Sequence, residues 1–378
     1  MDDINLWAAL GFAFAAYAVV GNDALQTLGT FINSNGRFHW SVLFGFAATI
    51  LVATFFYGWW INDGDPSFGR LSNVEKYPPI EVVQWFHVAP ALGLLVMTRF
   101  GVPVSTSFMV LAIFATMGGI GNMIEKSLVG YGLAFTVGGL LYLVLVRTAE
   151  KYFVANRETQ HARHWVVLQW LSTTWLWSVW LMQDFANIFV FLPRELSPLL
   201  AFAGLAVILV MLAITFANKG GPVQRVLKSK SSVTDIRSAT IIDFTYAGLL
   251  YYFKGVSQIP MSTTWVFLGL IAGREYAFSL MDRKRSITDT ARVTLTDVGK
   301  ALIGLVVSID MARGLPALVE GTPLYESDKG MWFFLGANVL LIPVGLFFVA
   351  KKSKWASLLL TASLLAGAAL FFVSLPLE

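Results

Sequence analysis

The chain has 378 residues, of which 56% are hydrophobic and 13% are charged, and it contains no cysteine. Soluble domains carry roughly a quarter charged residues, so this composition excludes an ordinary soluble domain and indicates a chain that is mostly buried or in contact with lipid. The absence of cysteine excludes disulfides, thiol chemistry and cysteine-based metal sites.

Apolar runs of membrane-spanning length recur along the chain. A transmembrane helix needs about 20 apolar residues, which predicts an all-α membrane protein with about 12 transmembrane segments. In chain order we expect them at about 5–33, 40–60, 81–99, 103–123, 128–146, 165–193, 197–217, 239–256, 258–280, 294–312, 331–350 and 355–375. No linker or low-complexity stretch divides residues 1–378, so we treat them as a single transmembrane domain.

Basic residues gather in alternate loops between these segments. Most of the 27 Lys and Arg residues fall in the stretches 147–163, 219–237, 274–292 and 351–354. Loops rich in Lys and Arg face the cytoplasm, so the net charge of +4 reflects topology, and no nucleic-acid partner is expected. The same rule predicts that both termini lie outside, and we expect a multi-pass protein of the plasma (inner) membrane.

Two short motifs each occur twice, in the same order. An aspartate flanked by amide side chains occurs at 22–26 and again at 183–187, and a proline followed by small hydroxyl residues occurs at 103–107 and 260–264. A duplicated order of this kind predicts two repeats.

The repeats are expected at 1–163 and 164–312, with two extra C-terminal helices in 313–378. Each repeat holds five predicted crossings, an odd number, so the second repeat should be inverted relative to the first. Inverted repeats with interrupted helices are typical of secondary transporters, whose substrate site lies where the repeats meet.

Two aspartates, Asp23 and Asp184, lie inside predicted membrane segments. A carboxylate in a membrane costs several kcal/mol and is a functional candidate by default. Neither motif contains a basic residue, and hard cations prefer oxygen ligands, so we expect Na⁺, or alternatively a proton, at Asp23 and Asp184. The predicted ion-binding residues are Asn22, Asp23, Gln26, Gln183, Asp184 and Asn187.

The two hydroxyl clusters follow Pro103 and Pro260. Proline favours the first turn of a helix and Ser or Thr favours its N-terminal cap, so each cluster should open a half-helix. The free N–H groups and the positive end of the helix dipole then favour an anion. The predicted anion-binding residues are Ser105, Thr106, Ser107, Ser262, Thr263 and Thr264.

The four motifs resemble those of the inorganic phosphate transporter (PiT) family, which carries Gly-x-Asn-Asp-x-x-Asn in each half and Pro-x-Ser-Thr-Thr downstream. The matching stretches are VVGNDALQTLGT, MQDFANIF, PVSTS and PMSTT, in the same order. Gln26, Gln183 and Ser107 depart from the family pattern and mark a divergent member. The resemblance implies sodium- or proton-coupled import of inorganic phosphate, or of sulfate, by a homodimer with an inverted-repeat fold.

Other functions stay open as alternatives. A proton-coupled sulfate permease of the same fold is the first, and an anion channel or a non-transporting sensor is the second. An enzyme is not expected, because each membrane aspartate has its own amide pair instead of sharing a proton with the other. No cofactor is expected beyond the coupling ion, and the roles of Asp243, Lys254, Asp297 and Lys300 stay open.

Overall fold

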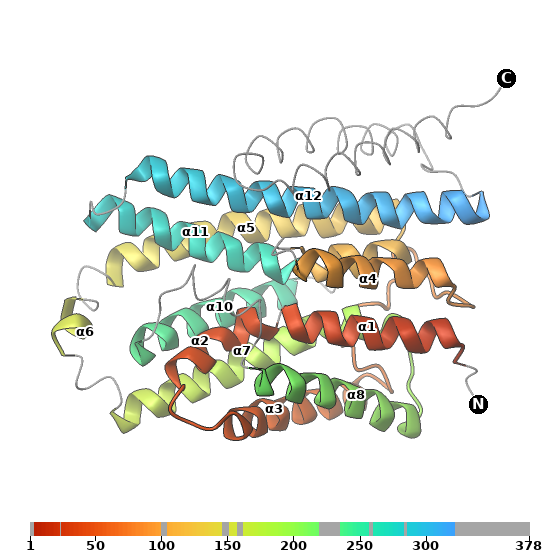
Figure 1. Ribbon diagram of the computed structural model, residues 1–378, viewed down its shortest axis with the longest axis horizontal. Helices are drawn as coiled ribbons and strands as arrows, with labels where there is room; N and C mark the ends of the chain where they lie inside the picture. The colour runs from red at the N-terminus through yellow and green to blue at the C-terminus, as the bar shows by residue number, and fades with distance from the viewer. Residues whose placement is uncertain are drawn as a thin grey trace.

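The computed structural model describes residues 4–22, 24–99, 104–145, 151–156, 162–218, 235–256, 260–282 and 286–321. Within these ranges every regular element is helical, which agrees with the predicted all-α class. The long helices run side by side along the long axis of the molecule (Figure 1). The predicted segments at 331–350 and 355–375 lie outside the described residues.

The long helices account for most of the described chain. They are α1 (Leu6–Asn22), α2 (Ala24–Ser34), α3 (Trp40–Ile61), α4 (Trp85–Arg99), α5 (Met117–Leu145), α7 (Arg163–Phe189), α8 (Pro198–Ala217), α10 (Ile236–Val256), α11 (Thr263–Asp282) and α12 (Ile287–Glu320). A short helix, α6 (Lys151–Ala155), precedes α7. Between α4 and α5 lie a π-helical turn, η1 (Ser107–Leu111), and a 3₁₀ turn, η2 (Ala112–Phe114).

Four of the described helices, α3, α5, α8 and α12, are long and apolar enough to cross a membrane. Helices α7 and α10 are of similar length, but they carry buried polar side chains such as Asp184 and Asp243. Such side chains lower the hydropathy of a helix while facing its protein neighbours. The structure therefore supports a helical membrane protein.

The predicted segments at 103–123 and 128–146 are wrong in their bounds. The first hydroxyl cluster leads into η1 and η2, the chain bends at Ala115 and Thr116, and α5 then runs unbroken from Met117 to Leu145. The pair Glu125-Lys126 interrupts the apolar pattern and so resembles a loop in the sequence. Both residues are good helix formers, and they continue α5.

Helices α5 and α11 pack against each other closely along much of their length (Figure 1). A Cβ atom added to Gly273 would overlap the backbone oxygen of Phe135, and one added to Gly269 would overlap that of Tyr131. Small residues allow helix backbones to approach in this way. The α5–α11 pair is therefore tightly packed, and the second hydroxyl cluster lies at the N-terminal end of α11.

Helices α1 and α7 occupy comparable surroundings. Helix α1 packs against α4 and α8, whereas α7 packs against α10 and α3, and the two helices also contact each other. Helix α4 ends, and α11 begins, near the middle of the long dimension of the molecule (Figure 1).

Candidate functional site

The first serine of each hydroxyl cluster caps the helical turn that follows it. Ser105 Oγ accepts a hydrogen bond from Phe108 N at 3.3 Å, and Ser262 Oγ accepts one from Trp265 N at 3.1 Å. This is the capping geometry that the sequence predicts. All six hydroxyl residues of the two clusters are buried.

The two hydroxyl clusters meet, although they lie far apart in the sequence. Ser107 Oγ donates to the backbone oxygen of Met261 at 3.0 Å. The backbone N–H of Ser262 donates to Ser127 Oγ of α5 at 2.8 Å, which ties the start of α11 to its partner helix. Residues from both predicted repeats therefore lie together at one site in the core.

The second aspartate motif joins the same place from α7. Asn187 Nδ2 donates to Asp184 Oδ1 at 2.5 Å, and it lies 3.2 Å from Thr106 Oγ1 and 3.3 Å from Ser107 Oγ. The carboxylate needs a donor, which fixes the orientation of the amide. Asn187 Oδ1 consequently points elsewhere, and it is buried with no hydrogen-bond partner from the described part of the chain.

Gln183 is engaged at both ends of its amide. Its Oε1 accepts from Arg70 Nη2 at 2.6 Å, and its Nε2 donates to the backbone oxygen of Leu250 at 2.9 Å. The amide oxygen that was predicted to assist a cation is therefore held by an arginine. A cation role for Gln183 stays a prediction.

Arg70 is the functional candidate that sequence reasoning missed. Neither aspartate motif contains a basic residue, but the fold places one near Asp184, whose charge acts on the Arg70 guanidinium. Burial lowers the pKa of Arg70 to about 10, while Asp184 and Tyr77 act in the opposite direction. Arg70 therefore keeps its positive charge at neutral pH, although its residue is only 2% exposed.

The loop that carries Arg70 is built around Asp65. The Asp65 carboxylate accepts from Ser67 N at 2.7 Å, from Ser67 Oγ at 2.5 Å and from Gly69 N at 2.9 Å. Gly69, with a φ of 70°, supplies the left-handed conformation that the turn requires. The nearby backbone oxygen of Gly64 accepts from Leu196 N at 2.9 Å, which ties this loop to the segment after α7.

We call these residues the central cluster: Arg70, Tyr77, Ser105, Thr106, Ser107, Gln183, Asp184, Asn187, Ser262, Thr263 and Thr264. The first aspartate motif falls only partly within the described residues. Asp23 and the side chains of Asn22 and Gln26 lie outside the described residues. The helices on either side of Asp23, α1 and α2, both contact α7.

A second buried polar group, the Asp243 cluster, lies between α2, α7 and α10. Thr30 Oγ1 donates to Asp243 Oδ1 at 2.6 Å, and Thr173 Oγ1 donates to Asp243 Oδ2 at 2.7 Å. Nearby, Asn35 Nδ2 donates to Gln169 Oε1 at 2.6 Å. Each carboxylate oxygen of Asp243 therefore has a hydroxyl donor.

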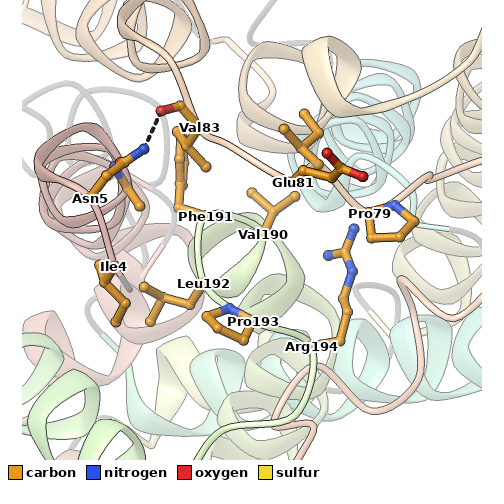
Figure 2. A pocket seen from close by; sticks show the side chains of 12 residues that line it. Ile4, Asn5, Pro79, Glu81, Val83, Val190, Phe191, Leu192, Pro193 and Arg194 are labelled. Carbon is orange, nitrogen blue, oxygen red and sulfur yellow. Dashed lines mark hydrogen bonds between the residues drawn. The ribbon is translucent and has the colours of Figure 1, made fainter. Parts of the chain in front are cut away.

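A cavity of about 220 Å³ opens beside the beginning of α1 and the end of α7 (Figure 2). Its wall includes Asn5, whose side-chain amide donates to the backbone oxygen of Val83 at 2.7 Å, together with Glu81 and Arg194 (Figure 2). Burial lowers the pKa of Arg194, and Asp65 acts in the opposite direction. None of the predicted anion- or ion-binding residues is among the residues that line this cavity.

No protein-family model, curated protein or solved structure matches the chain. The fold and the buried polar site define a helical membrane protein with a charged and hydroxyl-rich centre.

Proposed function

We propose that the protein is a secondary active symporter that imports a small tetrahedral oxyanion, with inorganic phosphate as the first candidate and Na⁺ or H⁺ as the coupling ion. One observation carries the proposal. Both hydroxyl clusters and the second aspartate motif converge in the core, joined by Asn187 to Thr106 and Ser107 and by Ser107 to Met261.

The polar side chains that meet in the core suit an anion and a cation bound side by side. Hydroxyl groups can donate to several oxygens of a tetrahedral anion, whereas carboxylate and amide oxygens of Asp184 and Asn187 suit a hard cation. In a buried site each ion offsets the cost of desolvating the other. Each ion therefore raises the affinity for its partner, which is the basis of coupled transport.

The packing of the helices supports two inverted repeats. Helix α1 would open the first repeat and α7 the second, and their contacts correspond: α1 with α4 and α8, and α7 with α10 and α3. In this proposal about 12 crossings form two repeats of five and a C-terminal pair. A homodimer in the plasma membrane, with both termini outside, completes the proposal.

The proposal is tested with the purified full chain in proteoliposomes. Uptake of labelled phosphate is measured under an inward Na⁺ gradient, under an inward proton gradient and under neither, each with and without excess sulfate. We expect accumulation above the external concentration under one of the two gradients. Competition by sulfate then decides between a phosphate carrier and a sulfate carrier.

Two results would overturn the proposal. Equilibration of the anion without accumulation would identify a channel, because a channel cannot couple two gradients. Absence of flux for both phosphate and sulfate, in vesicles whose protein is folded and correctly inserted, would favour a sensor.

A further inference from the structure

Arg70 buries hydrogen-bond donors that have no acceptor within the described part of the chain. Nη2 is bonded to Gln183, but Nε and Nη1 are buried and meet no acceptor there. An arginine side chain has only donors to offer, and leaving buried donors of a charged group unmatched is costly. Native proteins retain few such groups, and each one calls for an explanation.

Further unmatched polar atoms belong to the same cluster. The hydroxyls of Tyr77 and Thr263 and the amide oxygen of Asn187 are all buried without a hydrogen-bond partner among the described residues. Tyr77 interacts electrostatically with Arg70. Asn187 follows Gln183, the partner of Arg70, by one helical turn, so both side chains lie on one face of α7.

The charge around Arg70 is predominantly positive. Lys126 of α5 and Lys254 of α10 are close enough to Arg70 for its charge to act on both. Lys254 Nζ also lies 5.4 Å from the centre of the Phe68 ring, two residues before Arg70. The carboxylate that acts on Arg70 within the described part of the chain is that of Asp184. Among the described groups that act on Arg70, basic side chains therefore outnumber carboxylates, which favours an anion at this place.

We propose that Arg70 is a direct ligand of the transported anion and that it selects a divalent tetrahedral oxyanion. Nε and Nη1 of Arg70 and the hydroxyls of Tyr77 and Thr263 donate to the anion oxygens. Lys126 and Lys254 border this subsite and raise the local concentration of anions. The inference deepens the proposed function and rests on it.

Asn187 Oδ1 adds a requirement of a different kind, because it can only accept. A coupling cation beside the anion satisfies it, and so does the proton of hydrogen phosphate. The subsite thus offers donors for two or more oxyanion oxygens and one acceptor. Chloride, which is spherical and singly charged, matches neither the number of donors nor the charge.

Anion binding is measured on the purified full chain in detergent, by the shift of the melting temperature with sulfate or phosphate against chloride at equal ionic strength. We expect sulfate and phosphate, but not chloride, to stabilise the wild type. In Arg70→Gln and Arg70→Lys the apparent Kd for the oxyanion should rise about 10- to 100-fold, since hydrogen bonds to a charged donor are lost. A Kd at the wild-type value in both variants would overturn the inference.

Arg194→Gln is the matched control. Arg194 also has a buried Nη1 without a hydrogen-bond partner, but it lines the cavity of Figure 2 and not the central cluster. Its Kd should stay at the wild-type value. An equal loss in this variant would show that any buried arginine has the same effect, and would overturn the assignment to Arg70.

Lys254→Gln keeps the inference testable if the Arg70 variants do not fold, because Lys254 is only half-buried. We expect a Kd about 3-fold higher for the divalent anion and a weaker dependence on ionic strength. An unchanged Kd and an unchanged salt dependence would count against the positive subsite.

Transport and binding are scored separately, so that the two proposals fail in different ways. Oxyanion uptake with a KM insensitive to Arg70 would overturn this inference and leave the symporter standing. Arg70-dependent binding without coupled uptake would support this inference and overturn the symporter. A wild type that neither binds nor transports an oxyanion would overturn both.

Discussion

The central cluster and the Asp243 cluster are both buried and polar, and they differ in how completely their hydrogen bonds are made. In the Asp243 cluster each carboxylate oxygen accepts a hydrogen bond from a threonine hydroxyl. In the central cluster, by contrast, Arg70, Tyr77, Asn187 and Thr263 all bury polar atoms that find no hydrogen-bond partner in the ranges that the structure describes. A complete network stabilises the fold, whereas an incomplete one keeps donors and acceptors that a ligand can satisfy, as proposed for the central cluster.

We expect the largest effect from a change in the packing of α5 against α11, which supports the central cluster and not the Asp243 cluster. Gly273→Ala would drive the new methyl group into the backbone of Phe135 and push α11 away from α5. We expect a loss of stability of about 3 kcal/mol and loss of oxyanion binding, since overpacking strains the backbone.

Gly132→Ala is the control for this change, because a Cβ at Gly132 meets no atom within 4 Å. Thermal melting of both variants in detergent gives the comparison. Equal melting temperatures for the two variants would show that the close approach of α5 and α11 does not hold the central cluster together.

Substitution of Asp184 should affect transport, whereas substitution of Asp243 should affect stability. Asp184→Asn removes the carboxylate that faces Asn187 and Arg70, so coupled uptake per folded molecule should fall about 100-fold, as expected when a directly involved charge is lost. Asp243→Asn should keep uptake while lowering the melting temperature, because the amide keeps only one of the two oxygens that accept from Thr30 and Thr173. Full ion-coupled uptake by Asp184→Asn would remove the cation site from α7.

A matched pair of threonines gives the most sensitive test of the comparison. Thr263→Val removes a hydroxyl without a hydrogen-bond partner, so stability should hold while the Kd for the oxyanion rises about 10-fold. Thr173→Val deprives Asp243 of a donor and should cost about 1–3 kcal/mol with no change in Kd. The reverse pattern, measured by melting with and without phosphate, would contradict the distinction between the clusters.

Much of the helical framework could be predicted from the sequence. The expected segments at 40–60 and 197–217 correspond to α3 and α8, because a long apolar run has one common outcome in a membrane. The segment at 103–123 could not be predicted in the same way. Hydropathy does not distinguish one α-helix from a π turn and a 3₁₀ turn followed by a bend.

The candidate site was predictable where a motif recurs. The serine caps at Ser105 and Ser262 follow from local rules of helix termini, and both are present in the structure. Arg70 could not be inferred, because its placement depends on a contact with Gln183, which lies more than a hundred residues further along the chain. The available signal was Asp65 followed by Ser67 and Gly69, a pattern that indicates a structured turn instead of an open loop.

The stretch between α3 and α4 has a practical consequence for labelling. It contains no helix, yet it is attached at both ends: Leu196 N bonds to Gly64 O, and Thr116 N bonds to Lys76 O at 2.9 Å. Long connections are ordinarily the first choice for an epitope tag or a fluorescent insertion. Here an insertion between Gly64 and Lys76 would displace the guanidinium of Arg70 from the core, so reporters belong elsewhere on the chain.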